Sequence, residues 1–173
     1  MRYRHSIDFT VKKYGCPEIA AEIGVRSGEN AHGILAAFPI KYLILVDSYI
    51  AYNDEGSTIS QANQNVELWR MLTRLRDNLH RVVFMQMTSV EANKFFQDNF
   101  FDYIYIDADH SYEHIKQDIG LWYPKVKKNG VLAGHDYNVS SYQGIVKAVN
   151  EFIDVNNLTL VKFEDTDWLI EKK

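Results

Sequence analysis

The sequence predicts an α/β protein in which helices cover both faces of a doubly wound, mostly parallel sheet. Short apolar runs alternate with longer segments of helical spacing, which is the pattern of repeated strand–helix units. Each run is apolar at nearly every position, as expected for strands that are buried on both faces. Two strand-like runs lie close together at the end of the sequence. We therefore expect seven strands, with the final strand antiparallel.

The predicted strands share a short apolar run followed by polar residues or glycine. In chain order they cover residues 18–23, 42–46, 82–87, 103–106, 131–133, 159–163 and 167–171. In a doubly wound sheet, ligands bind beyond the carboxyl ends of the parallel strands. The residues that follow the first five strands are therefore the candidate functional positions.

The predicted helices share apolar side chains spaced so that they form one face. They cover residues 30–38, 66–79, 90–98, 112–123 and 142–155. Pro39 ends the first of them, and Ser111 and Ser141 are candidate N-caps of the last two. Helices of this length between buried strands complete the expected strand–helix alternation.

Two segments lie outside this alternation. Residues 1–16 precede the first strand and are expected to form an N-terminal cap segment. Residues 49–65 are polar and have no clear period, which favours a lid loop or a helix broken at Gly56. These two segments are the ones available to complete a substrate pocket.

The length and composition fit a single domain that spans residues 1–173. The hydrophobic share is 46% and the charged share is 24%, which is typical of a globular protein. One cysteine, Cys16, excludes an internal disulfide and favours a reducing compartment, so we expect a cytoplasmic protein. The sequence has no apolar run typical of a signal peptide or a membrane span. The formal net charge of −4 disfavours nucleic acids and anionic membranes as partners.

The loop after the first strand carries two glycines, Gly24 and Gly28. Gly24 can adopt a positive φ and lets a ligand approach the backbone, and Gly28 leads into a helix whose free N–H groups face that ligand. Their spacing differs from the dinucleotide-binding fingerprint, so no pyrophosphate is implied. Asp47 ends the second strand and can accept hydrogen bonds from both ribose hydroxyls. The pattern predicts an adenosine-containing ligand such as S-adenosylmethionine; a structural turn and a loop acid are the alternatives.

A second polar group follows the fourth and fifth strands. Asp107, Asp109 and His110 follow one strand, and His135 and Asp136 follow the other. We expect these strands to be neighbours, which would bring three carboxylates and two imidazoles together. Such a set suits Mg²⁺ or, with nitrogen ligands, Mn²⁺, and the ion would orient a substrate hydroxyl. The alternatives are a helix cap at Asp107, a solvated acid at Asp109 and a structural histidine at His135.

Two parts of the sequence resemble known enzymes. AEIGVRSGENAHGIL and LILVDSY, at residues 21–35 and 43–49, look like the first two motifs of class I S-adenosylmethionine-dependent methyltransferases. FDYIYIDADHSYEHIKQDIGLWYPKVKKNGVLAGHDYNV, at residues 101–139, is similar to small bacterial methyltransferases that include macrocin-type sugar O-methyltransferases. The resemblance implies a Rossmann-like fold and O-methylation of a small sugar-like or phenolic substrate.

The resemblance also implies which residues bind the cofactor. Glu22 and Gly24 would line its methionine and ribose end, and Asp47 would hold the ribose hydroxyls with Ser48 beside it. Ser89, after the third strand, would contact the adenine edge. The full expected set is Glu22, Gly24, Gly28, Asp47, Ser48, Ser89 and Asp107.

The same resemblance implies catalytic roles for Asp107, His110 and His135. His110 lies where catechol-type relatives have a lysine base, and an imidazole can accept the proton of a hydroxyl near neutral pH. The implied metal ligands are Asp107, His135 and Asp136, with Mg²⁺ or Mn²⁺ as the ion. Many relatives have an acid in place of His135, which shifts the expected ion toward those that accept nitrogen.

Two other functional classes fit parts of the sequence. A non-catalytic cofactor-binding or interaction domain would have the same fold. A metal-dependent glycosyltransferase would use Asp107-Ala108-Asp109 to hold a nucleotide-sugar diphosphate, but the loop of Gly24 and Gly28 would then have no role. We expect a small-molecule substrate, and a homodimer in which a neighbouring copy completes the pocket.

Overall fold

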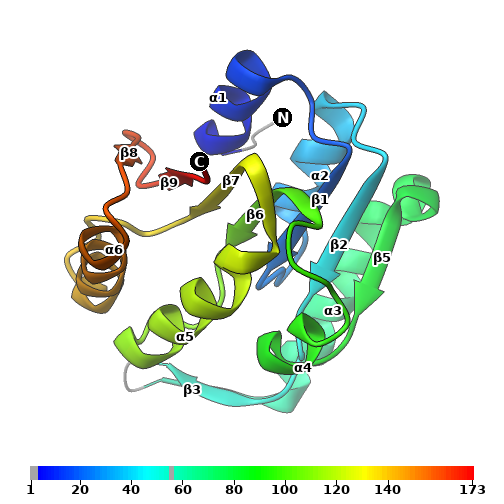
Figure 1. Cartoon of the computed structure of the whole chain (residues 1–173). Coiled ribbons are helices and arrows are strands. Elements are labelled where there is room, and N and C mark those ends of the chain that lie inside the picture. The colour runs from blue at the N-terminus through cyan, green and yellow to red at the C-terminus, as the bar shows by residue number, and fades with distance from the viewer. Residues whose placement is uncertain (1–3, 55–56) are drawn as a thin grey trace.

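One seven-stranded sheet runs through the described part of the chain (Figure 1). The structure is a computed structural model that describes residues 4–54 and 57–173. The strands of the sheet are β1 (Ile19–Ile23), β2 (Tyr42–Val46), β5 (Val82–Met85), β6 (Phe101–Ile106), β7 (Val126–Gly134), β8 (Leu160–Lys162) and β9 (Trp168–Glu171). Their order across the sheet is β5-β2-β1-β6-β7-β9-β8.

The strands pair as a mostly parallel sheet. β5, β2, β1, β6 and β7 are parallel to their neighbours, and β9 is antiparallel to both β7 and β8. The chain moves from β1 to β2 and β5 on one side, and from β6 to β7 on the other. The direction of winding therefore reverses between β1 and β6, which is where ligands bind in sheets of this kind. The predicted doubly wound sheet with a final antiparallel strand is confirmed.

Helices cover both faces of the sheet (Figure 1). On one face lie α1 (His5–Tyr14), α2 (Glu29–Ala37) and α3 (Gln61–Leu75). On the other lie α4 (Ser89–Asn93), α5 (Tyr112–Trp122) and α6 (Gln143–Asn156). Short 3₁₀ helices at Arg76–Arg81 and Tyr123–Lys125 connect helices to strands.

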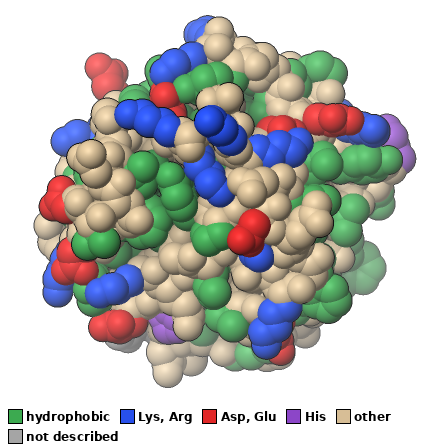
Figure 2. Space-filling view, viewed as in Figure 1, with side chains coloured by type: hydrophobic (Ala, Val, Ile, Leu, Met, Phe, Trp, Pro, Cys, Tyr) green, Lys and Arg blue, Asp and Glu red, His purple; other side chains and the backbone are tan. Residues whose placement is uncertain are grey.

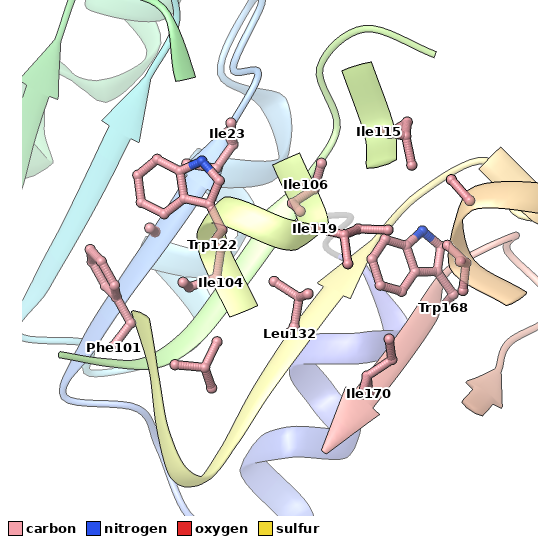
Figure 3. Packing of buried hydrophobic residues seen from close by; sticks show 14 of the residues in the cluster. Ile23, Phe101, Ile104, Ile106, Ile115, Ile119, Trp122, Leu132, Trp168 and Ile170 are labelled. Atoms are coloured by element: carbon pink, nitrogen blue, oxygen red, sulfur yellow. The ribbon is translucent and has the colours of Figure 1, made fainter. Parts of the chain in front are cut away.

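Burial on both faces explains why the strand sequences are apolar throughout. In β6, Ile104 faces the layer of α4, α5 and α6, whereas Tyr103 and Tyr105 face the layer of α1, α2 and α3. Figure 3 shows Trp122 of α5 near Ile104 and Ile119 of the same helix beside Trp168, and all four side chains are fully buried. Each parallel strand thus contributes to two cores, one on either side of the sheet.

Some strand boundaries and caps differ from those that the apolar runs predict. β7 begins at Val126, before the predicted strand at 131–133, and Val126 pairs with Phe101 ahead of a register shift. The apolar pattern does not extend over this part because the residues between Val126 and the predicted strand are mostly polar. Ser141 is not the N-cap of α6, since Tyr142 precedes that helix and makes no side-chain cap bond.

Two helix lengths also differ from the prediction. The helix predicted over 66–79 is α3, which begins earlier because the Ser60 side chain caps it by accepting a hydrogen bond from Asn63 N at 3.2 Å. The helix predicted over 90–98 ends at Asn93, whose side-chain amide donates to a backbone carbonyl of α5. In both cases a side-chain hydrogen bond lies at a boundary that periodicity alone does not locate.

The segment expected to be a lid or a broken helix is a hairpin followed by a helix. β3 (Tyr52–Asp54) pairs antiparallel with β4 (Ser57–Ile59), and α3 begins at Gln61. Gln61 fastens the segment, because its side-chain amide donates to Tyr49 O at 2.8 Å. Gly56, where we expected the break, lies outside the described residues.

α1 lies within the segment predicted to cap the fold, and distant acids hold its N-terminus. His5 N donates to Asp165 Oδ2 and Ser6 N donates to Asp167 Oδ2, both at 3.1 Å. Carboxylates at a helix N-terminus satisfy its free N–H groups and stabilise its dipole. Both acids lie in the turn between β8 and β9, so the start of α1, with Arg4 before it, is fastened to that turn.

The surface is mixed in character. On the face shown in Figure 2, acidic and basic side chains are interspersed. Trp69, on α3, is largely exposed, with 70% of its surface accessible. Within residues 4–54 and 57–173, no helix has the length and apolar character needed to cross a membrane.

Candidate active site

Backbone hydrogen bonds bring four strand ends together at the carboxyl edge of the sheet. Gly24 N, just after β1, donates to Val46 O of β2 at 2.9 Å. Asp107 N, just after β6, donates to Ile23 O of β1 at 2.8 Å, and His135 N donates to Ile106 O at 3.2 Å. The loops that carry the predicted site residues therefore start from strand ends that are joined by backbone hydrogen bonds across β2, β1, β6 and β7.

Gly24 is required by a close approach between two of these loops. Its φ is +85°, and a Cβ placed on it would lie 2.1 Å from Asp107 O. Gly28, with φ of +72°, precedes α2, and a Cβ there would lie 2.9 Å from Met71 Cγ of α3. Any larger residue would clash at either position, so both glycines have a packing role in addition to the predicted one.

Glu22 is a buried acid with an unsatisfied oxygen. It is 2% exposed, and its Oε1 accepts a hydrogen bond from Asn30 Nδ2 at 3.4 Å. Its Oε2 is buried and has no hydrogen-bond partner in the described residues. Burial, reinforced by the nearby charge of Asp107, raises the pKa of Glu22 from 4.5 to about 8. Such an oxygen is suited to accept a hydrogen bond from a bound ligand.

Asp47 organises the glycine loop directly. Its Oδ2 accepts hydrogen bonds from Val25 N and Arg26 N, each at 2.9 Å, and its Oδ1 accepts one from Tyr49 N at 3.0 Å. Ser48 follows it, and its hydroxyl accepts a hydrogen bond from Ile50 N at 3.4 Å; its contact with a ribose stays a prediction. The carboxylate thus fixes the loop after β1, and a ribose would share it with these backbone donors.

Ser89, predicted to contact adenine, uses its hydroxyl inside the protein. The hydroxyl donates to Asp118 and accepts a hydrogen bond from Trp122 Nε1, the latter at 2.9 Å. Burial raises the pKa of Asp118 to about 6, although the Ser89 hydrogen bond acts against that shift. The side chain therefore links α4 to α5, and the adenine contact stays a prediction.

Carboxylates and imidazoles from the loops after β6 and β7 lie together. One ligand atom from each of Asp107, His110 and Asp136 lies within 4.8 Å of the others, a spacing that could hold a metal ion. His110 Nε2 lies 3.1 Å from Asp136 Oδ2. His135 Nδ1 lies 2.9 Å from Asp136 Oδ1 and 3.8 Å from Asp107 Oδ1. The four predicted residues thus form one cluster, with Asp136 between the two histidines.

The two acids of this cluster have different protonation behaviour. Burial works against the charge of Asp136, but hydrogen bonds with His110 and His135 hold its pKa well below its ordinary value. Burial raises the pKa of Asp107, although nearby His135 and Arg4 oppose that shift. The environment therefore favours the charged form of Asp136, while Asp107 gives up its proton less readily.

Asp109 is separate from this cluster. Its Oδ1 accepts a hydrogen bond from Ser111 N at 2.8 Å, and its Oδ2 lies 3.3 Å from His114 Nδ1. Ser111 occupies the predicted N-cap position of α5 but makes no side-chain cap bond. Asp109 thus faces the first turn of α5, which matches the loop-acid alternative and separates it from Asp107.

Arg4 is a site residue that the sequence patterns do not indicate. Its Nη1 donates to His135 Nε2 at 2.7 Å, and its Nη2 lies 3.6 Å from Asp107 Oδ2. His135 Nε2 also lies 3.2 Å from Asp165 O. No local motif surrounds Arg4, and contacts distant in the sequence place it: the β8–β9 turn holds the start of α1, and Arg4 N donates to Asn30 Oδ1 at 3.4 Å.

The fold is that of class I S-adenosylmethionine-dependent methyltransferases. A sequence model described as a methyltransferase domain matches residues 21–137. The chain belongs to that family. The matched segment runs from β1 to the loop after β7, and it includes Glu22, Asp47, Asp107 and Asp136.

Solved structures of O-methyltransferases have the same fold. NovP is 17% identical, with a TM-score of 0.66 over 98% of this chain and 77% of that one. CalS11, a TDP-rhamnose 3′-O-methyltransferase of calicheamicin biosynthesis, is 15% identical, with a TM-score of 0.67 over 96% of this chain and 77% of that one. A putative caffeoyl-CoA O-methyltransferase from Staphylococcus aureus is 14% identical, with a TM-score of 0.70 over 100% of this chain and 85% of that one. No curated protein matched the sequence.

Proposed function

We propose that the protein transfers the methyl group of S-adenosylmethionine to a hydroxyl oxygen of a small sugar-like or phenolic molecule. The observation that carries this proposal is the carboxylate–imidazole cluster of Asp107, His110, His135 and Asp136 beside the glycine loop. The names of similar structures, which include NovP and CalS11, support an oxygen as the acceptor atom.

The cofactor is proposed to bind along the carboxyl ends of β1, β2 and β5. The unsatisfied Glu22 Oε2 would accept a hydrogen bond from it, and Asp47 would hold its ribose beside Ser48. Gly24 and Gly28 would leave space for the backbone to approach it. Backbone atoms near Ser89 would meet its adenine, and Asp107 would face its sulfonium side, where a negative charge favours the cationic cofactor.

Catalysis requires a nucleophilic oxygen in line with the methyl group. The oxygen forms a bond to the methyl carbon, the carbon–sulfur bond breaks, and its electron pair stays on sulfur. The hydroxyl proton must leave at the same time, and we assign its acceptance to His110, with Asp107 and His135 as the other catalytic groups. Asp136 beside His110 would stabilise the imidazolium that forms. Placement of the oxygen supplies a large part of the rate.

The cluster also fits a divalent ion. Asp107, His110 and Asp136 offer oxygen, nitrogen and oxygen atoms within 4.8 Å of one another, a set that suits Mn²⁺ and, less well, Mg²⁺. The three residues whose ligand atoms lie close enough together include His110 and not His135, the ligand expected from the sequence, so His110 replaces it in our proposed set. With the ion bound, His110 would be a ligand instead of the proton acceptor. When bound, such an ion lowers the pKa of a coordinated hydroxyl.

The test measures cofactor binding and methyl transfer separately. S-adenosylhomocysteine is titrated by calorimetry, and transfer of a labelled methyl group is measured on a panel of sugar nucleotides and catechols. Asp136→Asn and His110→Gln should retain binding and lower turnover by about 10²–10⁴-fold, because they remove the proton acceptor or its partner. Asp109→Asn, which changes the separate acid, is the matched control and should keep turnover.

Two outcomes would contradict the proposal. Absence of S-adenosylhomocysteine binding at millimolar concentration would exclude the cofactor. Undiminished turnover in both Asp136→Asn and His110→Gln would exclude the assigned site. If Asp109→Asn lost activity while UDP-sugar bound in the presence of Mn²⁺, the glycosyltransferase alternative would be favoured.

A further inference from the structure

A guanidinium group occupies one side of the cluster that would hold a metal ion. Arg4 Nη1 donates to His135 Nε2 at 2.7 Å, and Arg4 Nη2 lies 3.6 Å from Asp107 Oδ2. The side chain is partly buried, with 30% of its surface exposed. Arg4 therefore neutralises Asp107, one of the three proposed metal ligands, and engages the histidine that the sequence placed among them.

This arginine is held in place by the fold. The backbone N–H groups of His5 and Ser6 donate to Asp165 and Asp167. Asp167 is fully buried and also accepts hydrogen bonds from Ser6 Oγ at 2.6 Å and from Tyr105 OH at 2.7 Å. The residues next to Arg4 are thus anchored in the core, and the guanidinium is presented to the site by a docked helix.

We propose that Arg4 competes with a divalent cation for the Asp107 side of the active site, and that it thereby determines which cation the site holds. This inference rests on the proposed function, since it concerns the same carboxylate–imidazole cluster. The site then holds one of two cations: the guanidinium when α1 is docked, or the metal ion when Arg4 has moved away from Asp107.

The physical reason is electrostatic. An ion bound to Asp107 would share that carboxylate with the guanidinium, and two positive charges so close repel each other strongly in a partly buried site. Asp107 carries at most one negative charge, so it cannot neutralise both the guanidinium and the metal ion. Since the two states exclude each other, metal binding must weaken the docking of Arg4 by the same factor by which Arg4 weakens metal binding.

The first experiment measures Mn²⁺ binding to the full chain without substrate. Manganese chloride is titrated into wild type and Arg4→Gln, and free Mn²⁺ is followed by electron paramagnetic resonance. We expect Arg4→Gln to bind Mn²⁺ about tenfold more tightly, because it removes the competing charge and retains a polar side chain. Lys12→Gln is the matched control: it removes a positive charge from the exposed end of the same helix, where Lys12 pairs with Asp8. It should leave Mn²⁺ affinity unchanged.

The second experiment measures the reciprocal effect on wild type, so it does not depend on how a variant folds. Hydrogen exchange at the amides of His5 and Ser6 is compared with and without saturating Mn²⁺. We expect faster exchange with Mn²⁺, because the ion displaces Arg4 and loosens the first turn of α1.

The inference is overturned if Arg4→Gln binds Mn²⁺ no more tightly than wild type, if neither binds Mn²⁺ at millimolar concentration, or if exchange at His5 and Ser6 does not change. S-adenosylhomocysteine is titrated into the same samples to separate this failure from that of the proposed function. Retained S-adenosylhomocysteine binding would leave the methyl-transfer proposal standing while the competition is rejected.

Discussion

At the scale of single residues, Asp107 constrains two others through different atoms. Its backbone carbonyl comes so close to Gly24 that no side chain fits there. Its side-chain charge lies near Glu22 and reinforces the effect of burial on that acid. Asp107 thus restricts the loop after β1 by steric contact, and its charge raises the pKa of Glu22, apart from any role in catalysis.

We predict that Gly24→Ala destabilises the protein by about 2–4 kcal/mol, because alanine combines an unfavourable positive φ with a backbone clash. Binding of S-adenosylhomocysteine should be lost at the same time. Gly120→Ala is the control, since no atom lies within 4 Å of a Cβ there and the residue is within α5. It should be neutral or stabilising by up to about 1 kcal/mol in urea denaturation. Equal stability of the two variants would refute the clash.

We predict that Glu22 makes stability fall as the pH rises from about 4.5 to about 8. In this interval the folded protein keeps the Glu22 proton and the unfolded chain releases it, so the unfolded state binds fewer protons and is favoured by higher pH. Glu22→Gln should remove this contribution. The difference in free energy of unfolding between variant and wild type should therefore grow in favour of the variant across the interval.

Urea denaturation at several pH values measures this difference. Glu113→Gln, the same change at an exposed acid in the first turn of α5, is measured alongside as the control for the substitution itself. A difference for Glu22→Gln that does not vary with pH would show that Glu22 ionises alike in the folded and unfolded states.

At the scale of elements, α1 depends on acids that lie in a distant turn. Its own N-cap residue, Arg4, makes no side-chain cap bond, and the backbone N–H groups of His5 and Ser6 donate instead to Asp165 and Asp167. Ser6 adds a side-chain bond to Asp167, and Thr10 donates to Ser6 O at 2.7 Å. The helix and the β8–β9 turn therefore form one hydrogen-bonded unit.

We predict that Asp167→Asn destabilises this unit by about 1–3 kcal/mol, because an amide replaces a buried carboxylate that accepts three hydrogen bonds. Chemical denaturation gives the total loss, and proteolysis near residues 12–14 would report the loosening of α1. Asp8→Asn, on the outer side of the same helix, should change stability by less than about 0.5 kcal/mol. If both variants had the same stability, the buried network would not hold α1.

At the scale of the whole molecule, two cores on opposite faces of one sheet stabilise the fold. Trp168 of β9 lies in one of them and is fully buried, whereas Trp69 of α3 is largely exposed. A Cβ on Gly134 of β7 would meet the Trp168 ring at 2.5 Å, so the two neighbouring strands fit around that ring.

We predict that Trp168→Ala lowers the free energy of unfolding by about 3–5 kcal/mol, since it leaves a large cavity in a closely packed core. Trp69→Ala removes the same side chain from the surface and should change stability by less than about 0.5 kcal/mol. Urea denaturation followed by circular dichroism compares the two. Similar losses for both would mean that the core containing Trp168 does not govern global stability.

The sheet could be predicted because its strands are buried on both faces and therefore stand out as apolar runs between helices. Boundaries such as Val126 and Ser60 could not, since they depend on pairing and capping rather than on apolar periodicity. β3 and β4 could not be predicted either, because they are short and lie in a polar segment with no alternating pattern.

The site was partly predictable for a similar reason. Asp107, His110, His135 and Asp136 follow adjacent strands, so the topology alone brings them together. Both histidines contact Asp136, through His110 Nε2 and His135 Nδ1, and Arg4 contacts the other nitrogen of His135. This arrangement depends on how each ring is turned, which the sequence does not show. Arg4 itself is separated from His135 by 131 positions in the sequence, so no local pattern links the two.

The anchoring of α1 also bears on the order in which the chain folds. His5 and Ser6 contact acids 160 and 161 positions away, so these contacts close very long loops. β8 pairs with β9 alone in the described sheet, and β9 follows all the other strands in the sequence. Contacts at such separations form late, because the entropy of loop closure must be overcome first. We therefore expect the first turn of α1 to dock only after the β8–β9 hairpin has formed, so that Arg4 reaches the cluster late in folding.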